Sequence, residues 1–347
     1  DEEYIEGMGD FLAQIKQATC KLRTGRGIRN SWISLGNTGS VTALLHDDAL
    51  IPHWKEFANA LQLYQTLHSS TVINELDFCN VQLAPSVLGL LLPALRRNRV
   101  KIFILENNDF ANVHEGIEFA VDVIRGNQKM KKLSCGNNRI NNMEDAQLLI
   151  DAVISHPSID EFRLNSCFGG DGVNGYDVLQ SIIASGDSFT TIIFIRNNIR
   201  TGGDTTISDY IVRNPPLNEL YLTSNHLSDD DAVLISCALK HNTNLKILDL
   251  SGNNITEVGN GALRKAAYDT TSLNTVSESN HTCYIYGVDF GDSPKNTNLH
   301  MVRHNRRRKL YHLLSMRNRE GSNVRHLNLE FGAENEEDND SIKLVPK

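Results

Sequence analysis

The stretch Leu245-Lys-Ile-Leu-Asp-Leu-Ser-Gly-Asn-Asn-Ile255 decides how this chain folds, because the same phrase recurs along much of its length. Two other close copies are Met130–Ile140 and Leu217–Leu227, and all follow the pattern LxxLxLxxNxL. Eight copies align with steps of 27 to 30 residues, and they start at Ile73, Val100, Met130, Ile159, Phe189, Leu217, Leu245 and Leu273. Such a period predicts a stack of similar units rather than one central core.

Each position in the phrase has an expected structural role. Residues four and six alternate with polar neighbours, which predicts a short strand with one buried face, so Leu220 and Leu222 should point inward. An amide at position nine should turn into the stack and bind backbone groups at the bend that follows the strand. Position nine holds Asn108, Asn138, Cys167, Asn197, Asn225 and Asn253, and the two outermost copies have Val81 and His281 there.

The remainder of each period is predicted to be helical. In Asp229–His241 the apolar residues recur near i, i+3, i+4 and i+7, which gives the helix one apolar face. Ser228 is placed to cap this helix, and three acids in its first turn suit the helix dipole. Pro93 lies inside another helical stretch and should kink or shorten it. The comparable stretches are Pro85–Asn98, His114–Asn127, Met143–His156, Asp204–Asn214 and Glu257–Tyr268.

A stack of strand–helix units must bend, since parallel strands lie about 4.8 Å apart whereas packed helices need roughly 8–10 Å. The strands then lie on the inner side of the arc. Residues 73–283 resemble the ribonuclease-inhibitor-like leucine-rich-repeat proteins, a group that includes the Ran GTPase activator and the sensor arms of NOD-like receptors. The predicted fold is an α/β leucine-rich-repeat solenoid of about eight repeats, an open horseshoe with parallel strands on the concave face and helices on the convex face.

The segment before the array, residues 1–72, is predicted to be an N-terminal cap, because the apolar end of a first repeat needs a cover. It contains an acidic start, a helical stretch, Phe11–Lys21, a stretch rich in Gly and Arg, and Trp32–Leu35. Leu50–Tyr64 then reads as the helix of a degenerate repeat, and its apolar face is formed by Trp54, Phe57, Ala58 and Leu61.

The segment after the array, residues 284–331, is predicted to be a C-terminal cap, and 332–347 an acidic disordered tail. A helix is expected over Leu299–Met316 and a strand over Val324–Phe331. The basic run Arg303–Lys309 has two interpretations. Either its arginines face solvent while Met301, Leu310, Leu313 and Leu314 cover the last repeat, or the run binds phosphate or serves nuclear import.

The flanks also carry a more particular resemblance. Pro52–Tyr64, Ser279–Cys283 and Asn305–Leu314 are similar to segments of a large diatom-type algal family of leucine-rich-repeat proteins. That resemblance would span nearly the whole chain, but it implies no activity.

Composition narrows the class of protein. The formal net charge of −8 over 347 residues argues against a dedicated nucleic-acid binder. Six widely spaced cysteines without a CxxC pair favour a reducing, intracellular and most simply cytoplasmic location. The longest apolar run, Val87–Leu95, is too short to span a bilayer. No signal peptide is visible, but the sequence starts at Asp1 without a Met, so organellar targeting stays open.

The residues that could carry chemistry do not form a known constellation. His281 and Cys283 lack further metal ligands nearby, and His300 and His304 have ligand spacing without a third ligand. Gly169–Gly175 has neither the ending of a phosphate loop nor the ligand spacing of a calcium loop. We therefore expect no enzyme activity, no metal, no cofactor and no small-molecule substrate.

The concave wall is the remaining candidate site, and it is expected to bind a protein. Ile193, Ile195 and Tyr221 are apolar or aromatic on an otherwise polar surface, which is the composition of a binding hot spot rimmed by charge. A wall of about 800 Å² matches one side of an ordinary protein interface. The predicted site residues are Ile104, Glu106, Arg163, Ile193, Ile195, Arg196, Tyr221 and Asp249. The alternative is that β-branched residues simply suit exposed strands.

Three functions fit these features. The first is a recognition or scaffold module that binds a protein partner through the concave wall. The second is a structural subunit of a larger assembly, held by its caps or its convex side. The third is a GTPase activator of the Ran-activator type, with Arg139 or Arg200 as the arginine that stabilises phosphate charge. The resemblance implies such an arginine on an early repeat turn, but Asn80–Pro85 has none.

Overall fold

The computed structural model describes residues 2–25, 32–36, 44–67, 73–96, 100–108, 113–169, 173–185, 188–291, 293–296 and 302–318. Within them, nine parallel strands form one sheet in chain order. The strands are β1 Trp32–Gly36, β2 Ile73–Cys79, β3 Val100–Glu106, β4 Lys132–Ser134, β5 Glu161–Arg163, β6 Thr191–Ile193, β7 Glu219–Tyr221, β8 Ile247–Asp249 and β9 Tyr284–Tyr286.

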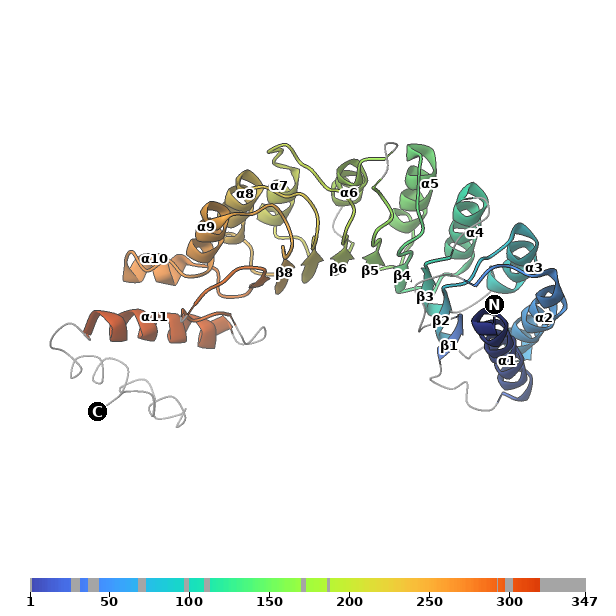
Figure 1. The fold of residues 1–347 in the computed structure, drawn as a ribbon. Coiled ribbons are helices and arrows are strands. Elements are labelled where there is room, and N and C mark those ends of the chain that lie inside the picture. The colour runs from blue at the N-terminus through green and yellow to red at the C-terminus, as the bar shows by residue number, and fades with distance from the viewer. Residues whose placement is uncertain are drawn as a thin grey trace.

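Helices follow the strands and line the outer side of an open arch, while the strands line its inner side (Figure 1). This arrangement confirms the predicted α/β leucine-rich-repeat solenoid. The helices are α1 Glu2–Thr24, α2 Ile51–Leu67, α3 Pro85–Leu95, α4 Val113–Gly126, α5 Met143–Ile154, α6 Gly175–Ala184, α7 Thr206–Val212, α8 Asp229–Leu239, α9 Glu257–Ala267, α10 Leu273–Glu278 and α11 Val302–Asn318.

The helix signals in the sequence are confirmed where the structure describes them. Ser228 caps α8, and its backbone N–H donates to the Asp231 carboxylate at 2.7 Å, which satisfies a donor that the helix itself leaves free. The shortening expected from Pro93 is an exception. Pro93 lies inside α3, which ends at Leu95, but α3 has 11 residues, as do α8 and α9.

Position nine of the phrase forms a continuous ladder of side chains inside the bends. The Nδ2 atom of Asn138 donates to the Leu105 carbonyl at 2.6 Å, and that of Asn225 donates to the Phe194 carbonyl at 2.8 Å. Cys167 takes the same place with its thiol 2.8 Å from the Cys135 carbonyl. The predicted role of position nine is therefore confirmed, since these contacts pair buried carbonyls of the preceding repeat.

At the N-terminal end, β1 pairs in parallel with β2 and extends the sheet beyond Ile73. Helix α2 follows β1, so the two have the strand–helix order of a repeat. Helix α1 packs against α2, where the rings of Phe11 and Trp54 lie 5.7 Å apart and edge-on. All four residues predicted for the apolar face of α2 are buried, which places this face against the array.

The last repeat differs from the sequence prediction. The copy expected to start a strand at Leu273 instead forms α10, and the ninth strand is β9, which pairs with β8. The repeat that begins at Leu245 is therefore longer than the others, because α10 lies between α9 and β9. His281 consequently does not occupy a ladder position in a bend, but lies buried in the segment before β9.

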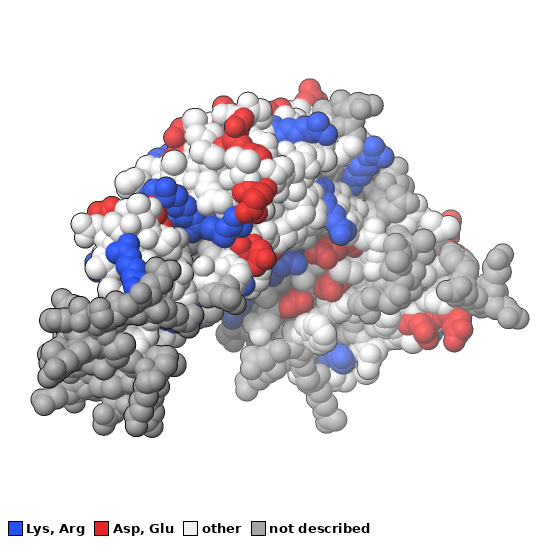
Figure 2. All heavy atoms as spheres, turned by 60° about the vertical axis from the view of Figure 1, so that its left-hand side comes forward, with Lys and Arg blue, Asp and Glu red and all other residues white. Residues whose placement is uncertain are grey.

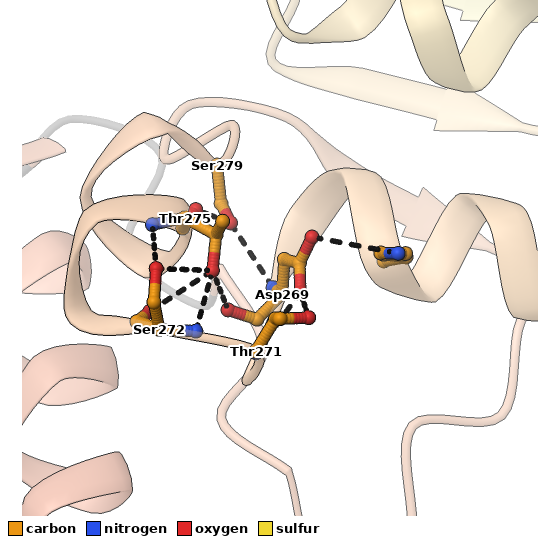
Figure 3. Close-up of polar contacts among 6 residues, drawn as sticks. Asp269, Thr271, Ser272, Thr275 and Ser279 are labelled. Atoms are coloured by element: carbon orange, nitrogen blue, oxygen red, sulfur yellow. Dashed lines mark hydrogen bonds and ion pairs between the residues drawn. The ribbon is translucent and has the colours of Figure 1, made fainter.

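Polar side chains hold this extra helix in place (Figure 3). Ser272 and Thr275 form a capping box at its start, with the Thr275 N–H donating to the Ser272 hydroxyl at 3.0 Å. Asp269 accepts from the N–H of Thr271, while its own N–H donates to the Ser279 hydroxyl at 3.1 Å. Both ends of the insertion are thus joined by hydrogen bonds.

Helix α11 packs against α10, as expected for a covering helix, but its basic residues are not all on the solvent side. Lys309 is completely buried, and its Nζ donates to the carbonyls of Ala267 at 2.5 Å and Asn280 at 2.8 Å. Solvent exposure was expected of the arginines, and Arg303 and Arg306 are exposed whereas Arg307 and Arg308 are half-buried. The burial of Lys309 was not predicted, and it supplies donors to backbone carbonyls that a helix end leaves free. Residues 299–301, Val324–Phe331 and 332–347 lie outside the described residues.

Candidate protein-binding site on the concave face

The sheet register brings five of the eight predicted site residues into one row across the concave face, which Ile104 on β3 joins through Ser134 on β4. Arg163 on β5 is the register partner of Ile193 on β6, which is in turn the partner of Tyr221 on β7. Asp249 on β8 continues the row beside Tyr221. Because alternate residues of a strand share a face, these side chains share one side of the sheet.

A hollow of about 380 Å³ opens at the centre of this row. Its lining combines two isoleucines and a tyrosine with charged and hydroxyl groups from β5, β6 and β7. The lining residues are Glu161, Arg163, Thr191, Ile193, Ile195, Glu219 and Tyr221. The sequence identified four of them, Arg163, Ile193, Ile195 and Tyr221, as site residues, and the structure brings these four together.

The other four predicted site residues lie outside the lining. Ile104 and Glu106 are on β3, two strands away from Arg163, and Glu106 accepts a hydrogen bond from the Ser134 hydroxyl. Asp249 stands beside the hollow, and its carboxylate accepts from the Ser251 N–H at 2.9 Å. Arg196 follows β6 in a left-handed conformation, with φ of 57°, and its side chain is exposed.

Ile193 is less accessible than an outward strand position suggests. Only 6% of its surface is exposed, whereas Ile195 and Tyr221 are partly exposed. Ile193 therefore forms the floor of the hollow, and Ile195 and Tyr221 supply more accessible surface. A partner would therefore meet Tyr221 and Ile195 first.

Two of the acidic groups around the hollow already have partners. The Glu161 carboxylate lies 2.6 Å from the Nζ of Lys132, and Glu219 accepts from the Tyr221 hydroxyl at 3.1 Å. Burial, reinforced by the negative charge of Glu219, raises the pKa of Tyr221 to about 12. Tyr221 is therefore neutral at physiological pH, and its hydroxyl donates a hydrogen bond to Glu219.

Arg163 differs from these groups. Its Nε atom is buried, and neither a hydrogen-bond acceptor nor an ion-pair partner exists for the guanidinium within the described part of the chain. A buried donor without an acceptor is costly in free energy, so unpaired groups of this kind need an explanation. The hollow thus contains one positive group that no described neighbour neutralises.

The N-terminal part of the wall is acidic and has a different internal network. The Asp77 carboxylate accepts from the Ser34 hydroxyl at 3.1 Å and from the Cys79 thiol at 2.7 Å. Burial is the main reason that the pKa of Asp77 is raised, and the nearby negative charge of Glu106 adds to it. On the face shown in Figure 2, positive and negative side chains lie interspersed among uncharged ones.

Several residues of the wall were not among the predicted site residues. Glu161, Thr191 and Glu219 were expected at outward positions, but their residue types did not mark them as part of a binding site. Tyr284 and Tyr286, whose rings lie 4.6 Å apart, were missed because the last strand was placed too early. A signal for the correct register exists, because Asn280 precedes Cys283 as Asn242 precedes Leu245, with Oδ1 accepting from that residue's N–H in both cases.

The remaining candidates form no second site in the described residues. Arg139 and Arg200 are exposed on turns after β4 and β6. No group of three metal-ligating side chains is found among the residues that the structure covers. No helix in the described ranges is long and apolar enough to cross a membrane.

Comparison with known proteins agrees with the repeat geometry. A family model described as Leucine Rich repeat matches residues 213–236 and 241–263, the part of the chain where the phrase is most regular. The chain contains leucine-rich repeats. These two matches span β7 with most of α8, and β8 with most of α9.

A solved structure of a Bacteroides fragilis protein is similar to part of the chain, with 14% identity and a TM-score of 0.38. The match covers 63% of this chain and 57% of that protein's chain, and so distant a likeness carries no argument about function. No curated protein matches the chain. The resemblance to a diatom-type algal family finds no support in these matches and stays a prediction.

Proposed function

We propose that this protein is a recognition or scaffold module that binds another protein through its concave wall, with the hollow between β5 and β7 at the centre of the contact. Leucine-rich repeats generally mediate protein–protein interaction. The observation that carries the proposal is the combination of Tyr221 and Ile195, both partly exposed, over an apolar floor with charged groups around it. Binding energy concentrates at such aromatic and apolar centres that partners can desolvate.

Electrostatics support a protein partner over a nucleic acid. The net charge of −8 and the acidic N-terminal part of the wall would repel a phosphate backbone. The proposed contact residues are Ile104, Glu106, Arg163, Ile193, Ile195, Arg196, Tyr221 and Asp249, extended by Glu161, Thr191 and Glu219 from the hollow. The proposed compartment is intracellular, most simply cytoplasmic.

Affinity capture from native lysate tests the proposal. Immobilised wild-type protein, Tyr221→Ala and Ile195→Ala are compared for the proteins they retain. Each substitution should lower retention of the same partner at least about tenfold, because truncating a hot-spot side chain costs upwards of about 2 kcal/mol. Both residues are partly exposed, so the variants should remain folded.

Val258→Ala is the matched control, because Val258 is 70% exposed on the convex helix α9. Retention unchanged in both wall variants, but reduced in the control, would contradict the concave-wall proposal. That outcome would favour a subunit held by its convex side. The GTPase-activator alternative has a separate test, since no acceleration of GTP hydrolysis by a Ran-type GTPase at micromolar protein would end it.

A further inference from the structure

The unpaired arginine in the hollow indicates what the partner contributes there. We infer that the partner inserts an acidic side chain, Asp or Glu, against Arg163, with an apolar side chain beside it over Ile195 and Tyr221. The inference rests on the proposed function and specifies the chemistry of the same site. The group that pairs with Arg163 is then a side-chain carboxylate within a segment of the partner protein.

The first support is that Arg163 is the exception among the charges of the hollow. Glu161 has Lys132 at 2.6 Å, and Glu219 has the Tyr221 hydroxyl at 3.1 Å. The Arg163 guanidinium has no such acceptor among the described residues, although its Nε is shielded from water. Arg163 therefore lines the hollow with a positive charge that has no hydrogen-bond or ion-pair partner among the described residues.

The second support is geometric. A guanidinium presents its N–H groups in a planar fork, and its two terminal nitrogens match the two oxygens of a carboxylate. Such bidentate pairs combine charge with two parallel hydrogen bonds. A neutral amide or hydroxyl of the partner could accept only part of this donor set.

A third support comes from the other buried or half-buried cations. Lys309 donates to the Ala267 and Asn280 carbonyls, and Arg308 donates to the Lys295 carbonyl. These groups serve the closure of the C-terminal end. Arg163 has no such carbonyl acceptor among the described residues, and it lines the hollow instead of the C-terminal end.

The spacing of the hollow limits the partner segment. Arg163 and Tyr221 are two strands apart in register, which is about 10 Å, or roughly three residues of an extended chain. The wall continues beyond both, to Ile104 on one side and to Asp249 on the other. A bound chain can therefore run past the hollow in both directions, which favours an internal Asp or Glu over a terminal carboxylate.

Selection of a random-peptide display library on the immobilised full-length protein tests this inference. The peptides that wild type enriches should carry Asp or Glu within about three residues of a large apolar side chain. Selection of the same library on the immobilised Arg163→Glu variant should enrich peptides with Lys or Arg in place of the acidic residue. Peptides with a free C-terminus but no internal acid form a separate arm that tests the terminal carboxylate.

Affinities of one enriched peptide then quantify the contact. Arg163→Gln should weaken binding about tenfold to a hundredfold, since it removes a charge-assisted pair. Arg163→Lys should recover only part of the loss, because an ammonium lacks the fork. Arg200→Gln, an exposed arginine on the turn after β6, should leave affinity unchanged.

Distinct results contradict the inference and the proposed function. Peptides that bind the wall and lose affinity in Tyr221→Ala, but show no acidic preference, would overturn the inference alone. Equal affinity for Arg163→Gln and Arg200→Gln would do the same. A selection that yields no peptide sensitive to Tyr221→Ala would contradict the proposed function and the inference with it.

Discussion

The middle of the array and its C-terminal end follow the same strand–helix order, yet their interiors are built differently. In the middle, the fully buried rings of Phe162 and Phe194 lie 6.2 Å apart in an apolar core that is continuous along the array. At the end, Tyr268, Val276 and Leu313 form a small separate cluster. Around it lie buried polar groups, among them Lys309 and His281.

This difference shows how a solenoid can close an open end. A repeat in the middle has neighbours on both sides, so apolar area decides its stability. The last repeat has one neighbour, and backbone carbonyls after α9 would be left without donors. Lys309 supplies two of those hydrogen bonds near the negative end of the α9 dipole, so charge and hydrogen bonding contribute more at this end.

The largest expected effect is in the middle. Phe162→Ala should lower the free energy of unfolding by about 3–5 kcal/mol, because it removes a ring that is fully buried between Phe189 and Phe194. Chemical denaturation followed by circular dichroism measures this change. A loss below about 1 kcal/mol would contradict the description of the middle as the stabilising region.

A smaller effect is expected from the matched truncation at the end. Leu313→Ala should cost about 2 kcal/mol, the lower part of the range for buried leucines, because its cluster is small. The loss should be local, with faster hydrogen exchange in α10 and α11 and unchanged exchange in β5–β7. A cost equal to that of Phe162→Ala, with exchange raised throughout, would remove the contrast between the two regions.

An effect of similar size concerns pH and the buried His281. Burial, aided by the positive charges of Lys309 and Arg306, lowers its pKa from 6.5 to about 4. Between these two pH values the unfolded chain binds a proton that the folded chain does not. Stability from this group is therefore fully present above pH 6.5 and is lost as pH falls toward 4, by about 2 kcal/mol after allowance for screening.

Thermal denaturation across this pH range checks the assignment. His281→Gln should flatten the acid-side decline, and His241→Gln, at an exposed histidine on the convex side, should leave it unchanged. A decline of the same size in wild type and His281→Gln would assign the acid sensitivity to other groups. As pH falls, hydrogen exchange should stay slower in the middle of the array than at its C-terminal end.

The sequence predicted the regular part of the fold because each repeat carries the same constraints. The spacing of inward leucines and position-nine asparagines predicted the positions of strands β3–β8, and Ser228 predicted the start of α8. The error at Leu273 has a physical cause. A helix of six residues was inserted before β9, and its alternating Ser and Thr residues imitate the polar positions of a strand.

The candidate site was predictable only in part. Strand alternation correctly placed Arg163, Ile193 and Tyr221 on one face. Their order of exposure was not predictable, because the accessibility of Ile193 depends on how neighbouring strands position longer side chains over it. The missing acceptor of Arg163 is likewise a property of the packed neighbours and has no sequence signal.

Site-specific photo-crosslinking of the captured complex tests concave-wall binding most directly. A photo-reactive residue is placed at Ile247, the register partner of Glu219 at the edge of the hollow, and in a second variant at Val233, which is exposed on α8. If the partner binds the concave wall, it should crosslink from position 247 and not from position 233. Crosslinking from position 233 with none from 247 would contradict recognition through the concave wall.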